Sequence, residues 1–435
     1  MGRPPANAPL NVFLNARLAG VLRRESSGAI DFRYDPQWLS WESTFPISLS
    51  LPLREDRYIG APVIAVFDNL LPDSEPIRRR VAERVGANGT DAYSMLAALG
   101  HDCVGALQFL PQGADPGPAG KVEGKSVSES EVAAIIQNLA TAPLGMGEDD
   151  DFRISIAGAQ EKTALLRRDG KWYKPTGTTA TTHILKPQIG RLPNGIDLSN
   201  SVENEYFCLN LLAALGVPTA NVEIADFGER RTLIVERFDR RWTNDKRLLR
   251  LPQEDCCQAL SVPPTRKYQS DGGPAMKDIL QLLKGSDAPN EDSAAFLRAG
   301  IVFWLIGATD GHAKNFSLFL SPGGRFRLTP LYDVLSAQPS LDAGQIQRKA
   351  FKLAMSVGKN RHYAMNDILP RHFLQTAEIA GISAAVVQSI FKDLVENFEA
   401  AFAKVMKGLP KGFPDQMVDS IRSAATRRIS LIKDS

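Results

Sequence analysis

Long hydrophobic runs are missing from this sequence, and cysteine is scarce. The longest apolar run, AGIVFWLIGA at residues 299–308, falls well short of the roughly 18 residues that a membrane-spanning helix needs. The N-terminal stretch also lacks the sustained apolar segment of a signal peptide, so we expect a cytoplasmic protein that does not enter a membrane. The 4 cysteines have no C-x-x-C spacing, so neither a zinc site nor a disulfide framework is indicated.

An excess of charge of one sign is missing as well. The chain has 51 Lys and Arg residues against 49 Asp and Glu residues, a formal net charge of +2. This balance does not by itself draw the chain onto nucleic acid or acidic lipid. A hydrophobic share of 43% is typical of a folded protein, and 435 residues exceed what one hydrophobic core supports. We therefore expect at least two domains.

The first third of the chain predicts a small α/β domain followed by a linker. Residues 1–110 mix short apolar runs with turn residues, and FPISLSLPL at 45–53 has the alternation of a strand. The stretch that follows, PQGADPGPAGKVEGKSVSES, is rich in Pro, Gly and Ser. We therefore assign residues 111–151 to a linker.

The rest of the chain predicts a strand-rich part, residues 152–245, and a helical part, residues 246–435. FRISIAGAQEKTALLRRDGKWYK indicates two β-prone runs joined by a Gly-containing turn, with an Asp-Gly turn after the second, and THILK and TLIVERF indicate two more strands. Between them lies a helix with Asn200 as N-cap, Glu203 as capping-box partner and Gly216 as C-cap.

The stretch GATDGHAKNFSLFL contains the spacing D-x-x-x-x-N, at which protein kinases place a catalytic Asp and a metal-binding Asn. Here these residues are Asp310 and Asn315. A chain of this length contains roughly one such match by chance. A second match, Asp239 to Asn244, lies in charged, turn-like sequence, and we interpret it as solvated surface. Asp310 instead follows an apolar helix, from which we expect its carboxylate to lie at the rim of a core instead of out in solvent.

A β-hairpin is predicted directly after this stretch. FSLFL and RFRLTPL flank the turn SPGG, and antiparallel pairing brings Asn315 near Asp333, with Asp310 one short loop away. Two carboxylates and an amide oxygen suit Mg²⁺ ions bridged by phosphates. The alternative is that all three residues only cap turns and strand ends, which Asp and Asn favour.

A nucleotide site also needs a cation on the phosphates, commonly a strand Lys held by a helix Glu. Lys186 ends THILK, and Glu205 lies inside the apolar stripe of the next helix while Glu203 points away. Glu205 could instead reach a nearby surface. The turn SIAGAQEKT is a weak phosphate-loop signal, since it has one glycine. His101, Asp102 and Cys103 are too close in sequence to form a nucleophile, a base and its orienting group, and we interpret them as structural.

Several long motifs resemble one known family. FDNLLPDSEPIRRR, RISIAGAQEKTALL, THILKP, NEYFCLNLLAALG, VERFDRRW, LPQEDCCQAL and GATDGHAKNFSLFL...LTPLYDVLSA occur in the order and wording of the HipA toxin kinases, the kinase half of a bacterial toxin–antitoxin module. The resemblance implies an α+β, protein-kinase-like fold of two lobes. Its strand-rich N-terminal part carries an extra small α/β domain, and its C-terminal lobe is all-helical.

The resemblance also implies a serine/threonine protein kinase that uses ATP and Mg²⁺. Asp310 is then the catalytic base, Asn315 and Asp333 bind Mg²⁺, and Lys186 holds the ATP phosphates. Ser155 corresponds to the family's autophosphorylated serine, and a phosphate there would switch the kinase off by expelling the phosphate-binding turn. The other implied ATP contacts are Ala157, Gly158, Ala159 and Gln160 in that turn, Glu205 in the helix, and Glu236 and Phe238 in the hinge.

The partners that the resemblance implies are a small HipB-like helix-turn-helix antitoxin and a translation protein as substrate. Family members phosphorylate an aminoacyl-tRNA synthetase, in the best-known case glutamyl-tRNA synthetase, which causes growth arrest and drug tolerance (persistence). Operator DNA is bound mainly through the antitoxin, which fits a kinase of net charge +2. This chain has no H-R-D or G-x-G-x-x-G motif, which argues against control by a eukaryotic type of activation loop.

Two other functions stay open at this point. A small-molecule kinase would use the same ATP site, because the acceptor pocket is built from loops that carry no recognisable motif. A non-catalytic DNA-binding co-repressor would keep only a vestige of the kinase site. The presence of Lys186, Asp310, Asn315 and Asp333 together argues against such decay.

Overall fold

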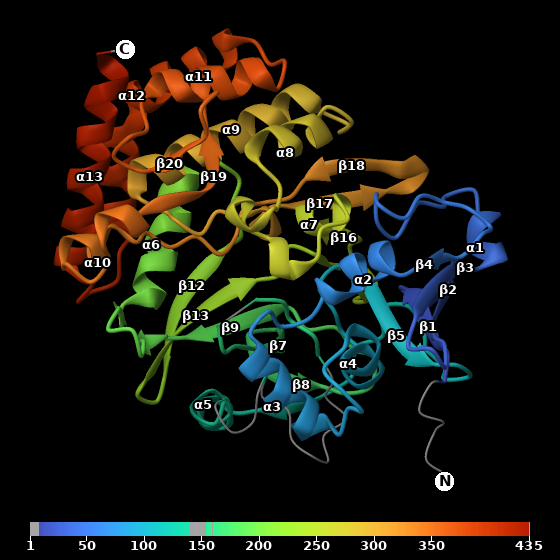
Figure 1. The fold of residues 1–435 in the computed structure, drawn as a ribbon. Helices are drawn as coiled ribbons and strands as arrows, with labels where there is room; N and C mark the ends of the chain where they lie inside the picture. The colour runs from blue at the N-terminus through green and yellow to red at the C-terminus, as the bar shows by residue number, and fades with distance from the viewer. Residues whose placement is uncertain (1–7, 140–143, 145–153, 159, 435) are drawn as a thin grey trace. The chain divides into compact units, whose positions relative to one another are not determined.

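The computed structural model describes residues 8–139, 144, 154–158 and 160–434 (Figure 1). Helices and strands are mixed throughout, which confirms the expected α+β class. The chain folds into two compact units, each assembled from separate stretches of sequence. The first unit comprises Met1–Pro187, Ala225–Thr265 and Leu318–Phe326, and the second comprises Gln188–Ile224, Arg266–Ser317 and Arg327–Ser435.

The N-terminal part of the first unit is an antiparallel sheet in the order β4-β3-β2-β1-β5. Its strands are β1 Leu10–Leu14, β2 Arg17–Arg24, β3 Ile30–Tyr34, β4 Tyr58–Ile59 and β5 Leu107–Pro111, and its helices are α1 Pro36–Leu39, α2 Ala61–Asp68, α3 Glu75–Val85 and α4 Ala92–Leu99. Phe67 of α2 joins the sheet to the helices, because its ring packs edge-on against both Phe32 and Phe109. This aromatic core supports the small α/β domain that the sequence predicts.

The prediction of a strand at residues 45–53 is wrong. The segment is irregular, and its backbone groups bond to side chains instead of to a neighbouring strand. The Tyr34 hydroxyl accepts a hydrogen bond from the Ile47 amide at 3.0 Å, and Glu254 Oε1 accepts one from the Leu49 amide at 2.8 Å. The two prolines in FPISLSLPL lack the N–H that a strand ladder needs.

A second sheet, in the order β12-β13-β9-β7-β8-β6, completes most of the first unit. Its strands are β6 Gly124–Val127, β7 Thr163–Arg168, β8 Lys171–Pro175, β9 His183–Pro187, β12 Val222–Phe227 and β13 Arg230–Glu236. Helix α5, Glu129–Gln137, packs Val132 and Ile136 against Leu165 and Ile234 of this sheet. The strands expected at THILK and TLIVERF are confirmed as the antiparallel pair β9 and β13.

Two expectations for this region need correction. The interval 111–151, assigned to a linker, contains the strand β6, which pairs with β8, and the helix α5. The run FRISIA does not form a strand over its described residues, since Ile154 only bridges to Asp102. The Asp-Gly turn is confirmed, because Asp169 and Gly170 join β7 to β8 with φ of 50° and 75°.

Short strands close the first unit. The hairpin of β14 and β15 follows β13, and β16 pairs with β17, which pairs with β18. Their bounds are β14 Arg240–Trp242, β15 Leu248–Arg250, β16 Gln253–Asp255, β17 Ser317–Ser321 and β18 Arg325–Leu328, with helix α7, Cys256–Ala259, after β16. The hairpin predicted from FSLFL and RFRLTPL is therefore confirmed.

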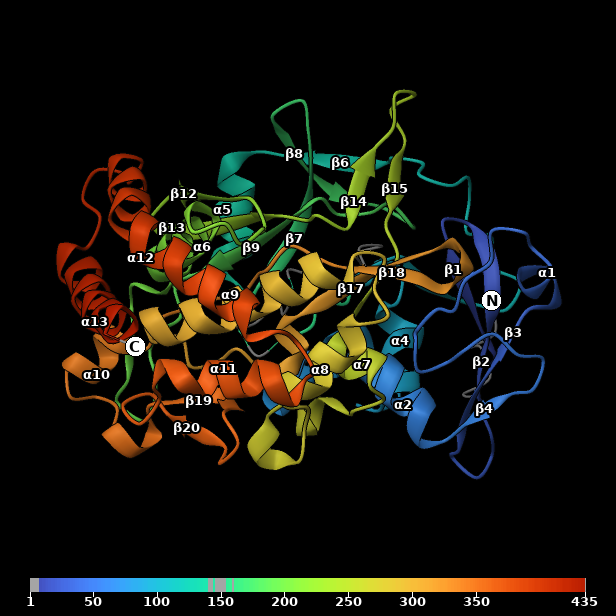
Figure 2. The same ribbon diagram turned by 90° about the horizontal axis from the view of Figure 1, so that it is seen from above.

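Helix α9 is the centre of the second unit. Figure 2 shows it among α8, α11, α12 and α13, and 12 of its residues are buried. The helices are α6 Ser201–Ala214, α8 Met276–Leu283, α9 Pro289–Ile306, α10 Gln338–Asp342, α11 Pro370–Ile379, α12 Ala384–Lys407 and α13 Asp415–Lys433. The C-terminal part is not all-helical, because it also contains β19 Lys352–Val357 and β20 His362–Ala364.

Helix α6 begins at the expected place but is capped differently. Asn200 is the N-cap residue, yet its side chain makes no capping hydrogen bond. Gln188 does so instead: its Oε1 accepts from the Val202 amide at 2.9 Å, and its Nε2 donates to Glu203 Oε2 at 2.7 Å. The C-cap is Leu215, and Gly216 follows it with the left-handed φ of 80° that favours glycine.

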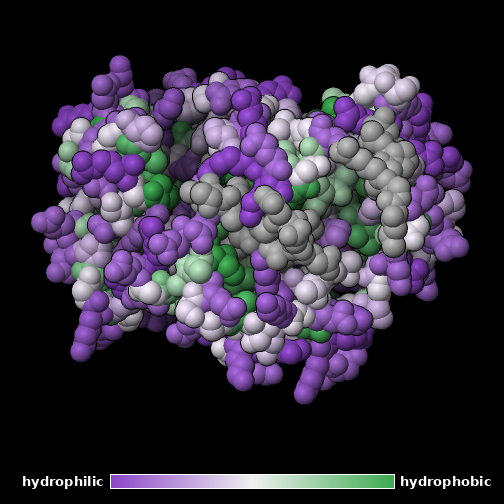
Figure 3. Space-filling model, turned by 90° about the horizontal axis from the view of Figure 1, so that it is seen from below, coloured by the Kyte–Doolittle hydropathy of each residue, from purple (hydrophilic) through white to green (hydrophobic). Residues whose placement is uncertain are grey.

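The face of the molecule in Figure 3 is mostly hydrophilic, and its hydrophobic residues occur in separate patches. Among the described residues, large exposed hydrophobic side chains are few and lie on different elements. Over the described part of the chain, every helix is too short or too polar to cross a bilayer.

A buried carboxyl predicts how the first unit responds to pH. Glu254 is 1% exposed, and among the described residues its Oε2 has no hydrogen-bond partner. Burial raises the pKa of Glu254 from 4.5 to about 8, although the Leu49 amide opposes the shift. The folded protein therefore keeps this group protonated at pH values where the unfolded chain ionises it. Its contribution to stability is complete below pH 4.5 and is lost as the pH rises through about 8.

We expect Glu254→Gln, which imitates the protonated carboxyl, to flatten the fall in stability between pH 5 and pH 8. The fall due to this group has a slope of up to about 1.4 kcal/mol per pH unit. Urea unfolding at several pH values measures it. The exposed Glu123→Gln variant serves as control and should keep the wild-type slope. Equal slopes for wild type and Glu254→Gln would contradict the assignment.

Candidate active site

The loop after α9 leaves the core at a fixed point. Gly307 ends the helix with φ of 72°, and a Cβ there would lie 2.8 Å from the ring of Phe351. Three residues on, the side chain of Asp310 is 57% exposed, whereas His312 is 2% exposed. The expectation that this carboxylate lies at the rim of a core instead of in solvent is therefore wrong: it is exposed, on a loop whose residues from His312 to Asn315 are buried.

Asn315 ties this loop together. Its Nδ2 donates to the Asp310 carbonyl at 2.8 Å and lies 3.5 Å from the carbonyl oxygen of Asp333. The base of the hairpin brings Asp333 there, since the Thr329 amide donates to the Ser317 carbonyl at 2.9 Å. The structure thus brings together the three residues that the hairpin argument predicted.

These residues fit a magnesium site. The amide nitrogen of Asn315 is used in the bond to Asp310, which leaves Oδ1 as the atom that can bind a cation. Asp333 would contribute a carboxylate, and it has a left-handed φ of 59°, a conformation that non-glycine residues adopt where the surrounding structure requires it. Oxygen donors of this kind are those that Mg²⁺ prefers.

Sequence reasoning missed Tyr268 and gave no role to His312. The Tyr268 hydroxyl donates a hydrogen bond to Asp310 Oδ1, and His312 Nε2 lies 4.0 Å from the same oxygen. The two rings meet edge to face at 4.9 Å between centroids. His312 could have been found from its place between Asp310 and Asn315. Tyr268 is 42 residues away from Asp310 in sequence, and no spacing rule connects them.

The predicted phosphate-binding residues lie in the first unit. Lys186 is 6% exposed on β9, and Gln160 Nε2 donates to the carbonyl of Pro187 at 2.9 Å, so the turn is attached to the end of that strand. Gly158 has a left-handed φ of 114°. Ala157 is half-buried beside it, and Ala159 lies outside the described residues.

The N-terminal domain holds this turn in place. Ser155 is fully buried, its Oγ donates to the Leu70 carbonyl at 2.7 Å, and its amide donates to the Asp102 carbonyl at 2.9 Å. The Asp73 amide donates to the Gly158 carbonyl at 3.0 Å. Residues more than 50 positions apart in sequence thus fix the loop that carries the predicted phosphorylation site.

Glu205 and Glu203 are both buried on α6, at 2% and 3% exposure. The expectation that Glu203 points away is wrong, because Gln188 binds its carboxylate. The pairing of Glu205 with Lys186 stays a prediction. In the predicted hinge, Glu236 is exposed and lies opposite His183 in the antiparallel register of β13 and β9. Phe238 is half-buried.

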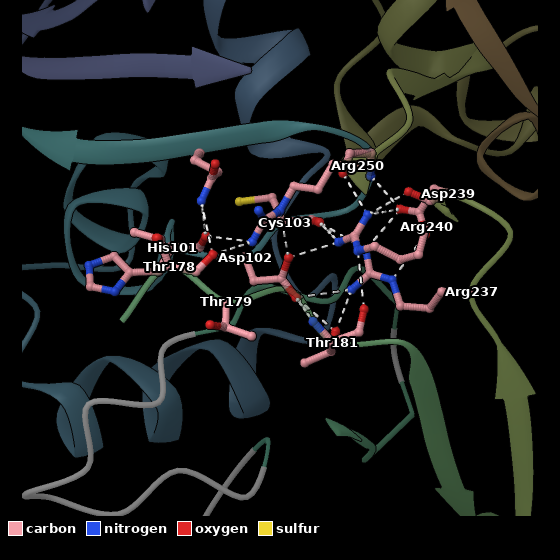
Figure 4. Close-up of polar contacts among 12 residues, drawn as sticks. His101, Asp102, Cys103, Thr178, Thr179, Thr181, Arg237, Asp239, Arg240 and Arg250 are labelled. Carbon is pink, nitrogen blue, oxygen red and sulfur yellow. Dashed lines mark hydrogen bonds and ion pairs between the residues drawn. The ribbon is translucent and has the colours of Figure 1, made fainter. Parts of the chain in front are cut away.

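A buried ion-pair network flanks the predicted hinge (Figure 4). Asp102 Oδ1 accepts from Arg240 at 2.8 Å and from Arg250 at 3.0 Å, and Asp102 Oδ2 lies 3.4 Å from Arg237. Asp239 pairs with Arg237 at 2.8 Å and is 4% exposed. The interpretation of Asp239 as solvated surface is therefore wrong, because its charge is compensated by buried arginines and not by water.

The network keeps its charges at neutral pH. Burial would raise the pKa of Asp102, but Arg240, Arg250 and Arg237 outweigh it and hold that pKa far below its usual range. Burial lowers the pKa of Arg240 to about 10, which still leaves it protonated. Burial also raises the pKa of the Cys103 thiol to about 12, so the thiol is no nucleophile, in line with the structural interpretation of GHDCVG.

Comparison with known proteins gives consistent matches. Residues 10–110 match the model of the HipA N-terminal domain, and residues 154–402 match that of the HipA-like C-terminal domain. The Sinorhizobium fredii protein Y4mE, named as a kinase, is 36% identical over 419 residues, which cover 95% of this chain and 94% of Y4mE. The serine/threonine-protein kinase toxin HipA of Shewanella oneidensis is 28% identical over 391 residues, 87% of this chain and 84% of HipA.

The fold has a solved counterpart. A chain from the structure of Shewanella oneidensis HipA, HipB and its operator DNA superposes with a TM-score of 0.81 and covers 98% of both chains. The two sequences are 24% identical over this superposition, so the likeness concerns the fold.

We expect Asp102→Asn to destabilise the protein by about 3–5 kcal/mol, because it leaves three buried arginines with one carboxylate. Asp226→Asn is the control: it removes a carboxylate that is 62% exposed and 3.7 Å from Arg231, and should cost less than about 1 kcal/mol. Urea unfolding of both variants measures the difference. Similar losses would show that the network does not depend on Asp102.

Proposed function

The chain belongs to the HipA family of toxin kinases, and we propose that it is a serine/threonine protein kinase that transfers the γ-phosphate of ATP to a protein hydroxyl. The observation that carries this proposal is the convergence of Asp310, Asn315 and Asp333 on one loop and the base of one hairpin. The exposure of the Asp310 carboxylate favours a large acceptor, because a protein side chain can approach it from solvent.

In the proposed reaction Asp310 is the general base. The acceptor oxygen forms a bond to the γ-phosphorus, the bond from that phosphorus to the β,γ-bridging oxygen breaks, and ADP leaves. The hydroxyl proton passes to the Asp310 carboxylate. Asn315 and Asp333 would hold Mg²⁺, which when bound neutralises charge on the phosphates.

We assign nucleotide binding to residues of the first unit and to Glu205. We assign the phosphates to Lys186 and to the turn Ala157, Gly158, Ala159 and Gln160, with Glu205 orienting the lysine. We assign adenine to the backbone of Glu236 and Phe238. The hydrogen bond from the Arg237 amide to the Thr182 carbonyl at 2.9 Å supports this assignment. Arg237 lies between Glu236 and Phe238, so this bond fixes the backbone of the predicted hinge.

We further propose that Ser155 is a self-inactivation site. Its Oγ is fully buried against a carbonyl oxygen, so a phosphate with close to two negative charges cannot take that place. The turn must leave its contacts with Leu70, Asp73 and Asp102 before Ser155 can be phosphorylated. It must also stay out of them afterwards, because phosphoserine does not fit there. Because the same turn is assigned to the ATP phosphates, its departure would abolish nucleotide binding.

The proposed partners are a HipB-like antitoxin, operator DNA reached mainly through it, and a translation protein as substrate, by resemblance glutamyl-tRNA synthetase. The HipA, HipB and operator DNA complex from Shewanella oneidensis supports the first two. The net charge of +2 supports a division of labour in which the antitoxin supplies most of the DNA affinity.

We expect the wild-type chain, dephosphorylated and then incubated with Mg²⁺ and ATP, to gain one phosphate on Ser155. Asp310→Asn removes the base and should slow this incorporation by at least about 100-fold. Peptide mass spectrometry over time measures both rates. Asp419→Asn removes an exposed carboxylate of α13 and should react like the wild type. An Asp310→Asn rate equal to that of the wild type would contradict the assigned base.

Phosphorylated wild-type protein should bind Mg·ATP at least about 10-fold more weakly than the dephosphorylated protein, because a change of this size follows from losing even one charge-assisted contact. Ser155→Ala should keep its affinity after the same incubation. Isothermal titration calorimetry measures both, with Ser126→Ala on β6 as a control that still loses affinity. Unchanged affinity in a chain shown to carry the phosphate would contradict the switch.

A further inference from the structure

Tyr268 makes a direct contact with the predicted base. Its hydroxyl donates a hydrogen bond to Asp310 Oδ1, although the Asp310 side chain is otherwise largely exposed. We propose that Tyr268 is a positioning residue for phosphate transfer, whose phenol holds the Asp310 carboxylate in the orientation that accepts the acceptor's proton. This inference rests on the proposed function.

The backbone at Tyr268 is fixed by a tight turn. The amides of Asp271 and Gly273 donate to the Tyr268 carbonyl at 3.0 Å and 2.9 Å. A Cβ at Gly273 would lie 2.0 Å from the carbonyl oxygen of Arg266, so no larger residue fits without a shift of the backbone. These two hydrogen bonds close the turn at Tyr268, the residue at which it begins.

The turn is also attached to β19. Gln269 Oε1 accepts hydrogen bonds from the Ser356 amide at 2.7 Å and from the Ser356 hydroxyl at 3.1 Å. Gln269 is the neighbour of Tyr268 in sequence, so this attachment fixes the place from which the phenol extends.

The ring of Tyr268 has two neighbouring side chains. His312, which is 2% exposed, meets it edge to face, and the Lys267 ammonium lies 5.6 Å from the ring centroid. His312 belongs to the same loop as Asp310, so the ring packs on the element whose carboxylate it contacts. The phenol oxygen is thereby directed at one point of the loop.

This arrangement suits a base that must be both exposed and oriented. A carboxylate side chain open to solvent turns among several rotamers, whereas a general base must lie within hydrogen-bond reach of the proton that it accepts. The phenol uses one lone pair of Oδ1. An ionised carboxylate has about four such sites, so it keeps the capacity to accept from a substrate hydroxyl.

The test uses Tyr268→Phe in the full chain, which removes the hydroxyl and keeps the ring against His312. We measure phosphate incorporation into Ser155 as a function of ATP concentration. The maximal rate should fall by about 10- to 100-fold, the loss that misplacement of a catalytic group produces. The ATP concentration at half-maximal rate and the melting temperature should stay at their wild-type values, which a purely structural role would not predict.

The comparison variants separate this inference from the proposed function. Tyr206→Phe on α6, whose ring packs on Phe413, is the matched control and should react like the wild type. In the Asp310→Asn background, Tyr268→Phe should cause no further loss, because its effect passes through the carboxylate.

Three results would overturn the inference. If the wild type incorporates phosphate and Asp310→Asn does not, but Tyr268→Phe equals the wild type, the positioning role is wrong while the kinase function stands. A faster Tyr268→Phe rate would show that the phenol competes with the acceptor for the base. A wild-type chain that incorporates no phosphate contradicts the proposed function, and the inference falls with it.

Discussion

The buried carboxylate of Asp102 is the contact on which the first unit depends. It binds Arg237, Arg240 and Arg250, and the carbonyl of the same residue accepts the Ser155 amide. Charges so far from water are tolerated only when each one is paired. Because one residue of the N-terminal domain satisfies three arginines from the following lobe, the two parts form one structural unit. The loop at Ser155 and the segment at Arg237 are thereby set by the same side chain and its backbone.

In the second unit, the contacts around Asp310 restrict the orientation of an exposed carboxylate. The buried helix α9 ends at a glycine, Asn315 closes the loop by bonding to the Asp310 carbonyl, and the base of the hairpin brings Asp333 to Asn315. Backbone and amide hydrogen bonds thus fix the loop, while Tyr268 contacts the carboxylate itself. This division explains how a side chain that is 57% exposed can have a defined orientation.

The arrangement of the loop that carries the predicted base was predictable because its parts are close in sequence. An apolar helix, a polar loop and a hairpin follow one another between residues 289 and 333, so the turn at SPGG alone brings Asn315 and Asp333 together. The place of Lys186 on β9 was predictable from a short apolar strand. The capping of α6 by Gln188 was not predictable, because Asn200 and Glu203 satisfy the capping pattern in the sequence. Only the fold shows that Gln188 takes their place.

The sequence by itself determined the α+β class, the strands β9 and β13, the helix α6, and the hairpin that carries the predicted metal ligands, because these follow from local periodicity and turn chemistry. Only the tertiary structure decided that Asp239 is buried, that Ser155 is held by Leu70, and that Tyr268 reaches Asp310. Each of these depends on contacts between residues that are far apart in the chain. A charged or polar residue has the same local signature on the surface and in a buried network, and its partners become known only when distant segments meet.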